Sequence, residues 1–493
     1  MERYDVCIIG GGCVGMATAV SLSRFQLRIA LLEKECDVAF GVSKANSGII
    51  HGGFHYPDTT LKGRLELQGN RMFWKLHQEL GFPCKQCGIL LAAFSQEEIP
   101  VLEKLFERGR NNGCKGLELC DKVRTKELES KIAPDVMASL YVPEGGVVEP
   151  YKYVFALSEL AKENGVEIHT SFRVTHSELT ADGRILTSAD GRKVSTKWVI
   201  NCAGLYADEV SALLGGESFR IRPRKGEEYL LDRNSTAYPD KVIFPVPLPH
   251  SKGVLVIPTA GGTTMVGPTA DLVEDKEDNT TTAESREKIF ALAKRMVPAV
   301  SERDLITAFS GSRPVMDGNE DFYIAASEKT PGLIQAAGIQ SPGLTASPAI
   351  GEYICSLLKQ EGVEFRLKKN IVTTLPAEKK VRELSAEEVD SLSKEDPAWA
   401  RIVCRCEKIS EAEIRRAIRR GHTTVEGIKL YTRAGMGRCQ GGFCTSKILK
   451  LIAGETALPM EKVTRNGEGS ELLYGEFQTL FTAENGKKEE NSK

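Results

Sequence analysis

The sequence predicts an α/β protein with three parts: a domain built on a parallel sheet, an antiparallel-sheet domain, and a small α-rich domain towards the C-terminus. The first is predicted by a strand, a glycine-rich turn, a helix and a second strand in residues 4–33. The second is predicted by apolar strands that proline and glycine separate in residues 220–269. The third is predicted by two short helix patterns between two pairs of cysteines after residue 400.

The N-terminal stretch has the glycine spacing of a dinucleotide-binding turn. An apolar run leads into Gly10-x-Gly12-x-x-Gly15, and a second apolar run ends on Glu33. The first glycine allows a sharp turn, the second lets the backbone approach a pyrophosphate, and the third lets helix and strand pack closely. The helix N-terminus attracts phosphate charge. Residues 4–33 therefore predict a dinucleotide cradle in which Glu33 accepts hydrogen bonds from a ribose.

The residues that follow favour FAD over NAD. The cradle begins at residue 4 and continues into Lys34, and no second glycine motif of this kind offers a separate nicotinamide site. In residues 43–56, SKANSGIIHGGFHY, small side chains would let the backbone lie against a flat ring system, with His51 among them. These residues resemble the D-amino-acid-oxidase-like FAD oxidoreductases, in which such a segment lies near the isoalloxazine. The resemblance implies cofactor contacts at Ser43, Asn46, Ser47, Gly48 and Ile49.

Three later stretches are expected to return to the cofactor. The predicted strand at 166–174 ends at Val174. In the family that these residues resemble, a later strand in this place contributes to the adenine side of the FAD site. Gly204 follows the predicted strand at 197–203. Within GLIQAAGIQSPGLTASPAI, a strand-to-helix turn has an electropositive helix N-terminus that could meet the flavin. The alternative for this turn is an ordinary helix cap. Its candidate residues are Gly338, Gly343, Leu344 and Thr345.

Composition and charge exclude two classes of protein. The 493 residues carry 65 basic and 67 acidic side chains, a formal net charge of -2, so nothing indicates nucleic-acid binding. No apolar run reaches the roughly 18 residues of a membrane-spanning helix. Glu2, Asp5 and the glycine motif argue against a signal peptide. Thirteen cysteines without a signal sequence indicate a reducing, cytoplasmic location and cysteines used as metal ligands or core residues.

These patterns predict the domain organisation. The chain divides into an FAD-dependent oxidoreductase region, a linker rich in Lys, Glu and Ser, a metal-binding domain and a C-terminal extension, at 1–360, 361–400, 401–455 and 456–493. The FAD-binding parts of the first region are expected at about 1–80, 145–215 and 305–360, and the substrate domain at about 81–144 and 216–304. The tail at 485–493 is charged and expected to be disordered.

Four cysteines form the most specific metal signal. Cys404-Arg405-Cys406 is followed after 32 residues by Cys439-Gln440-Gly441-Gly442-Phe443-Cys444. Residues i and i+2 of an extended segment point the same way, so the first pair can bind one centre that the second pair closes from a glycine-rich loop. Four thiolates suit a 2Fe-2S cluster, and the two glycines leave backbone N–H groups to approach the sulfurs. Zinc is the alternative metal, although its sites usually pair C-x-x-C motifs.

Two helices are expected between the cysteine pairs. Ser410-x-x-Glu413 and Thr423-x-x-Glu426 each have the spacing of a helix-opening capping box.

The resemblance becomes more specific over residues 1 to about 360. The motifs SGIIHGG, RKGEEYLLD, VGPTA, GSRP and AGIQSPGLTASPAI are similar to FAD-dependent glycerol-3-phosphate dehydrogenases, and relatives that oxidise 2-hydroxyglutarate are also similar. IVCRCEKISEAEI and TRAGMGRCQGGFC resemble bacterioferritin-associated ferredoxin in its version fused to such dehydrogenases. The resemblance implies oxidation of sn-glycerol 3-phosphate to dihydroxyacetone phosphate, with electrons leaving FAD through a 2Fe-2S cluster. It implies an acceptor that is a second flavoprotein, an iron-sulfur subunit, or quinone at the inner membrane face.

Two residues are candidates for the chemistry. His51 is the candidate base for the alcohol proton, because neutral imidazole suits that task near pH 7. Its alternative role is a structural hydrogen bond beside the flavin. Arg313 is the candidate anion clamp, because its forked guanidinium suits phosphate or carboxylate, and its alternative is an internal ion pair. His55, Arg224 and Lys225 are weaker candidates.

The sequence leaves three other functions open. Arg313 would hold the carboxylate of a 2-hydroxy acid as well as a phosphate. An amino-acid dehydrogenase with a fused cluster, and an electron-transfer flavoprotein subunit without its own substrate, are the other two. Cys84-x-x-Cys87 lacks a thioredoxin-like context and is interpreted as two core residues rather than a redox pair.

Overall fold

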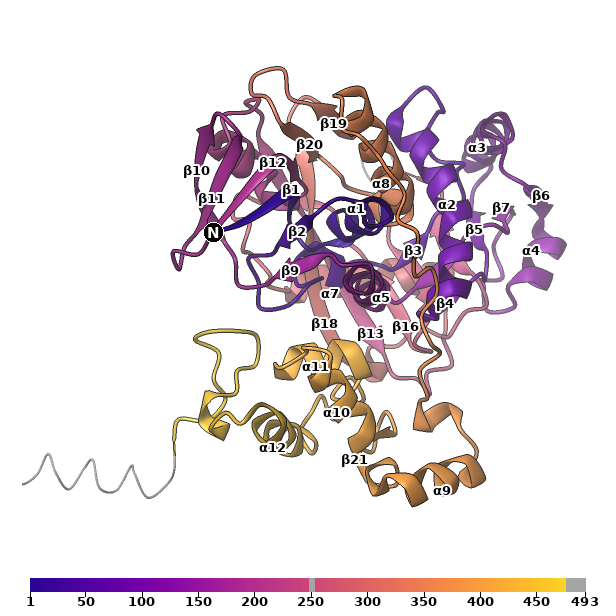
Figure 1. Ribbon diagram of the computed structural model, residues 1–493. Helices are drawn as coiled ribbons and strands as arrows, with labels where there is room; N and C mark the ends of the chain where they lie inside the picture. The colour runs from indigo at the N-terminus through magenta and orange to yellow at the C-terminus, as the bar shows by residue number, and fades with distance from the viewer. Residues whose placement is uncertain (248–252, 476–493) are drawn as a thin grey trace, which may run out of the picture. The chain divides into compact units, whose positions relative to one another are not determined.

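The structure is a computed structural model that describes residues 1–247 and 253–475 (Figure 1). The chain divides into two compact units, Met1–Ala377 and Glu378–Lys493. The tail at 485–493, expected to be disordered, lies outside the described residues. No helix in the described part of the chain is long and apolar enough to cross a membrane.

The first unit contains a parallel sheet built from buried apolar strands. Strands of this kind read as continuous apolar runs because both faces of the sheet are covered. Across the sheet the parallel strands are β9 (Glu167–His169), β2 (Ile29–Leu32), β1 (Glu2–Ile9), β12 (Lys193–Asn201) and β20 (Leu333–Ala337). Three further strands join it in antiparallel pairs: β10 (Val174–Thr180), β11 (Gly183–Ser188) and β19 (Tyr323–Ala326).

Helices pack closely beside this sheet. α1 contacts β1 and β2 and also packs against α5 and α8, while α8 packs against α2. Glycines permit the close approach: a Cβ at Gly69 would lie 2.2 Å from the carbonyl oxygen of Thr345, and one at Gly351 would lie 2.7 Å from that of Ala17. The four helices are α1 (Cys13–Ser23), α2 (Leu61–Leu80), α5 (Pro150–Glu163) and α8 (Gly343–Gln360).

A larger, mainly antiparallel sheet forms the rest of the unit, and only its β14–β5 pair is parallel among the described strands. Its strands lie in the order β17 (Asp271–Leu272), β13 (Ile221–Leu231), β16 (Thr264–Gly267), β15 (Leu255–Pro258), β14 (Val242–Pro245), β5 (Ile89–Ala93), β7 (Ala138–Val142) and β6 (Glu118–Asp121). β18 (Leu305–Met316) pairs with β13 along almost its whole length. Residues 305–316 were expected in the cofactor-binding part, but this pairing places them in the second sheet.

Smaller elements complete the first unit. A three-stranded sheet consists of β3 (Ile49–Ile50), β8 (Gly146–Val148) and β4 (Cys84–Lys85). The remaining helices are α3 (Ile99–Asn112), α4 (Lys122–Leu128), α6 (Ala207–Leu213) and α7 (Ala283–Met296).

The second unit is mainly helical, as expected. Ser410 and Glu413 form the predicted capping box at the start of α10. The next helix is capped by Thr424, whose side chain accepts a hydrogen bond from the Gly427 amide, and not by Thr423. The elements are α9 (Ala386–Glu395), β21 (Ile402–Cys404), β22 (Ile409–Ser410), α10 (Glu411–Arg419), α11 (Val425–Thr432) and α12 (Thr445–Thr456).

The stretch at 361–400, expected to be a linker, is structured and divides between the two units. Residues before the boundary bind the first unit: Val372 exchanges hydrogen bonds with the Asn164 side chain, and the Leu375 amide donates to the Glu79 carbonyl. Residues after the boundary contain α9, which opens with a capping box formed by Ser385 and Glu388.

Candidate functional site

The glycine-rich turn has the shape of a dinucleotide cradle. Gly10 adopts a φ of +110°, and a Cβ there would lie 2.4 Å from the Cys202 carbonyl oxygen. A Cβ at Gly15 would lie 2.0 Å from the Gly10 carbonyl oxygen, so helix and strand touch at this point. Gly12 precedes α1 without a side-chain cap, and only the Ser43 hydroxyl lies near its Cβ position. The N-terminus of α1 therefore has no side-chain cap from its own N-cap residue, which suits a helix that binds a phosphate group.

Glu33 lies at the end of β2, as a ribose-binding acid should. Its carboxylate accepts hydrogen bonds from the Gly11 amide at 2.6 Å and the Glu35 amide at 2.9 Å. Burial raises the pKa of Glu33, and these backbone hydrogen bonds oppose the shift. Each carboxylate oxygen has a second lone pair available to a ribose hydroxyl. Lys34 instead pairs with Glu35 at 2.8 Å and lies over the Tyr206 ring.

The segment with the predicted flavin contacts is held in one conformation. Asn46 closes it by donating to the Val42 and Ser43 carbonyls and accepting from the Gly48 amide. The Ser43 hydroxyl accepts from the first amide of α1, that of Cys13, at 2.9 Å. Together these contacts tie the segment to the cradle.

The second sheet presses against the same segment. A Cβ at Gly311 on β18 would lie 1.9 Å from the carbonyl oxygen of Ala45. Ser47 donates a hydrogen bond to Glu228 on β13, and Ile49 begins β3. The segment thus lies where the two sheets meet.

The remaining predicted cofactor residues lie at strand ends and helix starts. Val174 begins β10 and packs against a buried cluster of the parallel sheet. Gly204 has a φ of +58° just after β12, whose end approaches Gly10. Gly338 has a φ of +64° after β20, and Gly343 and Leu344 open α8. Their roles in binding FAD stay predictions.

His51 is buried and held in place by contacts around it. Its amide donates to the Thr345 hydroxyl at 2.9 Å, and its carbonyl accepts from the Asn70 side chain at 2.7 Å. The ring Nε2 lies 3.2 Å from the Ser341 hydroxyl, and the ring packs edge-on against Phe244. These contacts hold the imidazole in a fixed position, as a general base requires.

Arg313 belongs to a group of cationic side chains. It lies opposite Arg224 in the β13–β18 pair and donates to the Thr269 carbonyl at 3.3 Å. Burial lowers the pKa of Arg313; the negative charge of Glu228 opposes this shift, and the positive charge of Arg224 adds to it. Burial lowers the pKa of Lys62, and the positive charge of Arg224 also lowers it. Partly buried like charges of this kind would be stabilised by a bound anion.

Tyr56 and Ser341 connect the cationic group to His51. Burial raises the pKa of Tyr56, while the charges of Arg313 and Arg224 oppose the rise, so the phenol lies near both guanidinium groups. Its hydroxyl donates to the Ser341 carbonyl at 3.3 Å, and the Ser341 hydroxyl lies against His51. Sequence reasoning assigned neither residue a role, although both lie inside motifs that it singled out.

The weaker candidates have structural partners. The buried Lys225 forms an ion pair with the partly exposed Asp278 at 2.7 Å. The His55 ring packs edge-on against its neighbours Phe54 and Tyr56, and its carbonyl accepts from Arg108.

Glu228 is a buried acid that sequence reasoning also missed. Its Oε2 has no hydrogen-bond partner within the described ranges, and Oε1 accepts from Ser47. Burial raises its pKa to about 7, against the opposing effects of Ser47 and Arg313.

We expect Glu228 to make the folded state less stable as the pH rises. Its folded-state pKa lies above the ordinary value of 4.5, so its ionisation disfavours folding between about pH 4.5 and pH 7. Over that range the loss should approach about 3 kcal/mol. Urea unfolding of the holoprotein at pH 5, 6, 7 and 8 should show this loss in the wild type and a smaller one in Glu228→Gln. An identical pH dependence in both proteins would contradict the assignment.

The four predicted metal-binding cysteines come together in the second unit. Cys406 and Cys439 have their sulfurs 3.6 Å apart. The Cys444 thiol donates to Cys404, which lowers the pKa of Cys404 to about 6 and raises that of Cys444. A Cβ at Gly437 would lie 2.3 Å from the Cys406 Cβ, so the two cysteine loops meet at their backbones.

Backbone amides also point at these sulfurs. Gly435 and Glu407 donate to Cys404, and Gly441 and Phe443 donate to Cys439. The Gly442 amide instead binds the Cys439 carbonyl oxygen at 3.0 Å. Four thiols with backbone donors fit an iron-sulfur cluster, whose potential such hydrogen bonds tune.

We expect Cys444→Ser to lower the iron content by more than half, because an alcohol is a poor replacement for a thiolate ligand. Flavin bleaching by substrate should continue, since the cradle lies in the other unit. Iron analysis and the visible spectrum measure both effects. Cys84→Ser is the matched control, because burial raises the pKa of Cys84 to about 12 and leaves it a neutral thiol. Full iron content in Cys444→Ser would remove this residue from the ligand set.

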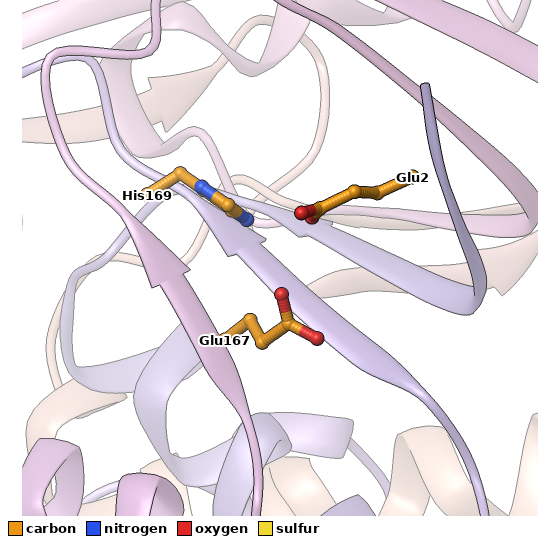
Figure 2. A group of neighbouring side chains, drawn as sticks. All are labelled: Glu2, Glu167 and His169. Carbon is orange, nitrogen blue, oxygen red and sulfur yellow. The ribbon is translucent and has the colours of Figure 1, made fainter.

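A second group of potential metal ligands lies at the N-terminal end of β1. Figure 2 shows Glu2, Glu167 and His169 directed towards one another, with ligand atoms within 4.8 Å. The Tyr4 hydroxyl explains the arrangement: it lies within hydrogen-bonding distance of the Glu2 carboxylate and of the Glu167 carboxylate, the latter at 2.7 Å, and 3.1 Å from His169 Nε2, and its one proton can be donated to either carboxylate. We assign this group to the hydrogen-bonding of a buried tyrosine.

The cradle, the buried histidine and the cysteine cluster together define a flavin-dependent oxidoreductase with an iron-sulfur domain. The chain belongs to the FAD dependent oxidoreductase family, whose model matches residues 5–357, and a BFD-like [2Fe-2S] binding domain matches residues 402–454. These matches confirm the predicted fold class and both cofactors.

Individual relatives agree with this assignment. The chain is 40% identical over 475 residues to a glycerol 3-phosphate dehydrogenase of Caloramator mitchellensis, covering 96% of this chain and 98% of the relative. The FAD-bound structure of L-alpha-glycerophosphate oxidase from Mycoplasma pneumoniae is similar with a TM-score of 0.73 and 31% identity, over 76% of this chain and all of that one. Human mitochondrial L-2-hydroxyglutarate dehydrogenase is 33% identical over 292 residues, 56% of this chain and 63% of that protein.

Proposed function

We propose that this protein oxidises sn-glycerol 3-phosphate to dihydroxyacetone phosphate and passes the electrons through a 2Fe-2S cluster to a partner. The observation that carries the proposal is the 40% identity to a glycerol 3-phosphate dehydrogenase, which extends over both units. The two Mycoplasma glycerol 3-phosphate oxidase relatives match only 71% and 75% of this chain, at 32% and 33% identity. A fused cluster domain therefore favours a dehydrogenase over an oxygen-consuming oxidase.

The cationic group supports an anionic substrate. Arg313 and Arg224 lie in register on neighbouring strands, and Lys62 lies over the Tyr56 ring at 5.2 Å. A phosphate dianion offers these side chains several acceptor oxygens, and the Arg313 fork can bind two of them. We assign Arg313 to phosphate binding, with Arg224 adding positive charge beside it.

His51 is assigned to the proton of the C2 hydroxyl. Its ring is fixed by Phe244 and Ser341, and Ser341 is connected through Tyr56 to the cationic group that would hold the phosphate. An alcohol held at its phosphate end by Arg313 would therefore present its hydroxyl in the region of His51. Removing that proton increases the electron density on the oxygen, which favours the departure of hydride from C2.

FAD, when bound, supplies the acceptor for that hydride. We assign its pyrophosphate to Gly10, Gly12 and the N-terminus of α1, and its ribose to Glu33, because these groups form the open cradle described above. Residues 43–49 and the start of α8 are assigned to the ring system, as proposed from the sequence. Cys404, Cys406, Cys439 and Cys444 are assigned to the cluster.

Anaerobic titration of the purified holoprotein tests the substrate. Glycerol 3-phosphate should bleach the flavin absorbance, whereas 2-hydroxyglutarate and amino acids should not. Bleaching by 2-hydroxyglutarate alone would move Arg313 to carboxylate recognition. Bleaching by an amino acid alone, or by none of the three, would replace the proposal with an amino-acid dehydrogenase or an electron-transfer subunit.

A further inference from the structure

The loop between the last two cluster cysteines exposes a large aromatic side chain. Phe443 precedes Cys444 and is 82% exposed, although its own backbone amide binds Cys439. The Cys406 side of the cluster is also exposed. Phe443 therefore presents an apolar ring to solvent next to the cysteines assigned to the cluster.

All the exposed charges in the two cysteine loops, 404–408 and 437–447, are positive. They belong to Arg405, Lys408, Arg438 and Lys447. The one acidic residue in these loops, Glu407, is buried and pairs with Arg433 at 2.9 Å. The loops thus present net positive charge to solvent, in a chain whose formal net charge is -2.

The basic residues of the neighbouring helix α10 are arranged differently. Arg415 and Arg419 both pair with Glu455, and Arg416 and Arg420 both pair with Glu378. By contrast, Arg405, Lys408 and Lys447 form no ion pair with any described residue. The positive charges of these three residues are therefore left without an ion-pair partner among the described residues.

We propose that the surface formed by Arg405, Lys408, Arg438, Phe443 and Lys447 docks an acidic protein that accepts one electron at a time. The proposal rests on the proposed function and names the class of its partner. Opposite charge steers such a partner to the surface, and the exposed ring supplies a small apolar contact at its centre. Each docked acceptor takes one electron, so two acceptors are reduced for each alcohol that loses two electrons and two protons.

An anionic membrane would also attract basic residues, but it fits this surface less well. Membrane-bound surfaces bury a broad apolar face several side chains wide. Here Phe443 is the one large apolar side chain exposed within the two loops. A small patch with a single aromatic centre is closer to the limited contact areas of transient electron-transfer complexes.

Two forms of one acceptor test the proposal: native cytochrome c, which is basic, and the same protein made acidic by succinylation. Binding to the oxidised holoprotein is measured by calorimetry without substrate, so the result does not depend on which alcohol is oxidised. The acidic form should bind more tightly than the native form, and added salt should remove the difference. Tighter binding of the basic form, or no salt effect, would overturn the proposal.

Variants then locate the binding surface. Arg405→Glu/Lys447→Glu should weaken binding of the acidic form about tenfold or more, and Phe443→Ala should weaken it with little change in its salt dependence. Lys462→Glu and Tyr474→Ala are matched controls, since both side chains are exposed and lie outside the two loops. Unchanged binding in the loop variants would overturn the proposal, provided that their visible spectra show an intact cluster.

Stopped-flow mixing with glycerol 3-phosphate separates the remaining outcomes. If the surface serves the partner, the loop variants should reduce the cluster at the wild-type rate and reduce the acidic acceptor about 10–100-fold more slowly. Slower cluster reduction with an unchanged acceptor step would mean that the surface serves transfer within the chain. If the protein sediments with phosphatidylserine vesicles and does not bind the acidic protein, the surface binds a membrane and the proposal is wrong. Absence of flavin bleaching would contradict the proposed substrate without affecting the binding result.

Discussion

His51→Asn is expected to lower kcat for glycerol 3-phosphate by roughly 10²–10⁴-fold, the usual contribution of a general base. The amide side chain can keep one hydrogen bond in the pocket but cannot accept the alcohol proton at neutral pH. FAD should stay bound, because the backbone of His51, which binds Thr345 and Asn70, is unchanged. Anaerobic stopped-flow reduction of the flavin measures the chemical step directly.

His55→Asn is the matched control, since this histidine lies four residues away in the same segment. Its ring contacts Phe54 and Tyr56, and we expect only a small effect on kcat. A large loss in His55→Asn together with wild-type turnover in His51→Asn would transfer the base role to His55. Loss of FAD absorbance in His51→Asn would indicate a structural role instead.

Arg313→Ala is expected to lower kcat/KM for glycerol 3-phosphate roughly 30-fold to several thousand-fold, which corresponds to a loss of about 2–5 kcal/mol of binding free energy in the transition state. The substitution would leave a partly buried phosphate without its main partner. Arg313→Lys should recover only part of this loss, because an ammonium group lacks the fork that binds two oxygens. Steady-state kinetics with an artificial electron acceptor give the comparison.

Glycerol provides the control substrate, because it has the same secondary alcohol without the phosphate. If Arg313 binds phosphate, its removal should leave the already low kcat/KM for glycerol nearly unchanged. An equal loss with both substrates would show that Arg313 maintains the structure of the β13–β18 pair, and that the anion is bound elsewhere.

Local patterns in the sequence predicted much of the fold because they report local physics. α2 (Leu61–Leu80) illustrates such local signals: the Thr60 side chain accepts a hydrogen bond from the Gly63 amide at its start, and Gly81 is left-handed after its end. The glycine spacing of the cradle reflects close contacts that only glycine permits, such as that of Gly15 with the Gly10 carbonyl. Cysteine spacing located the cluster domain for the same reason.

Contacts between distant residues could not be predicted in this way. Residues 305–316 were expected in the cofactor-binding part, and only the pairing of β18 with β13 shows that they belong to the second sheet. The close packing of α2 on α8 is another such contact, since a Cβ at Gly69 would lie 2.2 Å from the Thr345 carbonyl oxygen.

The sequence predicted only part of the candidate site, because some of its residues are brought together by contacts between distant parts of the chain. His51 and Arg313 stand out as residue types with suitable chemistry. Tyr56 and Ser341 acquire a role only because the fold brings residues 285 positions apart into hydrogen-bonding contact. The buried position of Glu228 likewise depends on Ser47, which lies 181 positions away.

The contact between Gly311 and Ala45 sets a fixed spacing. Gly311 lies two residues before Arg313 on the same strand, and its backbone touches the segment assigned to the flavin ring with no side chain between them. Moving the strand and the segment apart would break this contact, and moving them closer would make their backbones clash. With Arg313 assigned to the anion and this segment to the flavin ring, we expect the protein to select substrates by the number of carbon atoms between their anionic group and the carbon that is oxidised, and phosphorylated alcohols of graded length would test this.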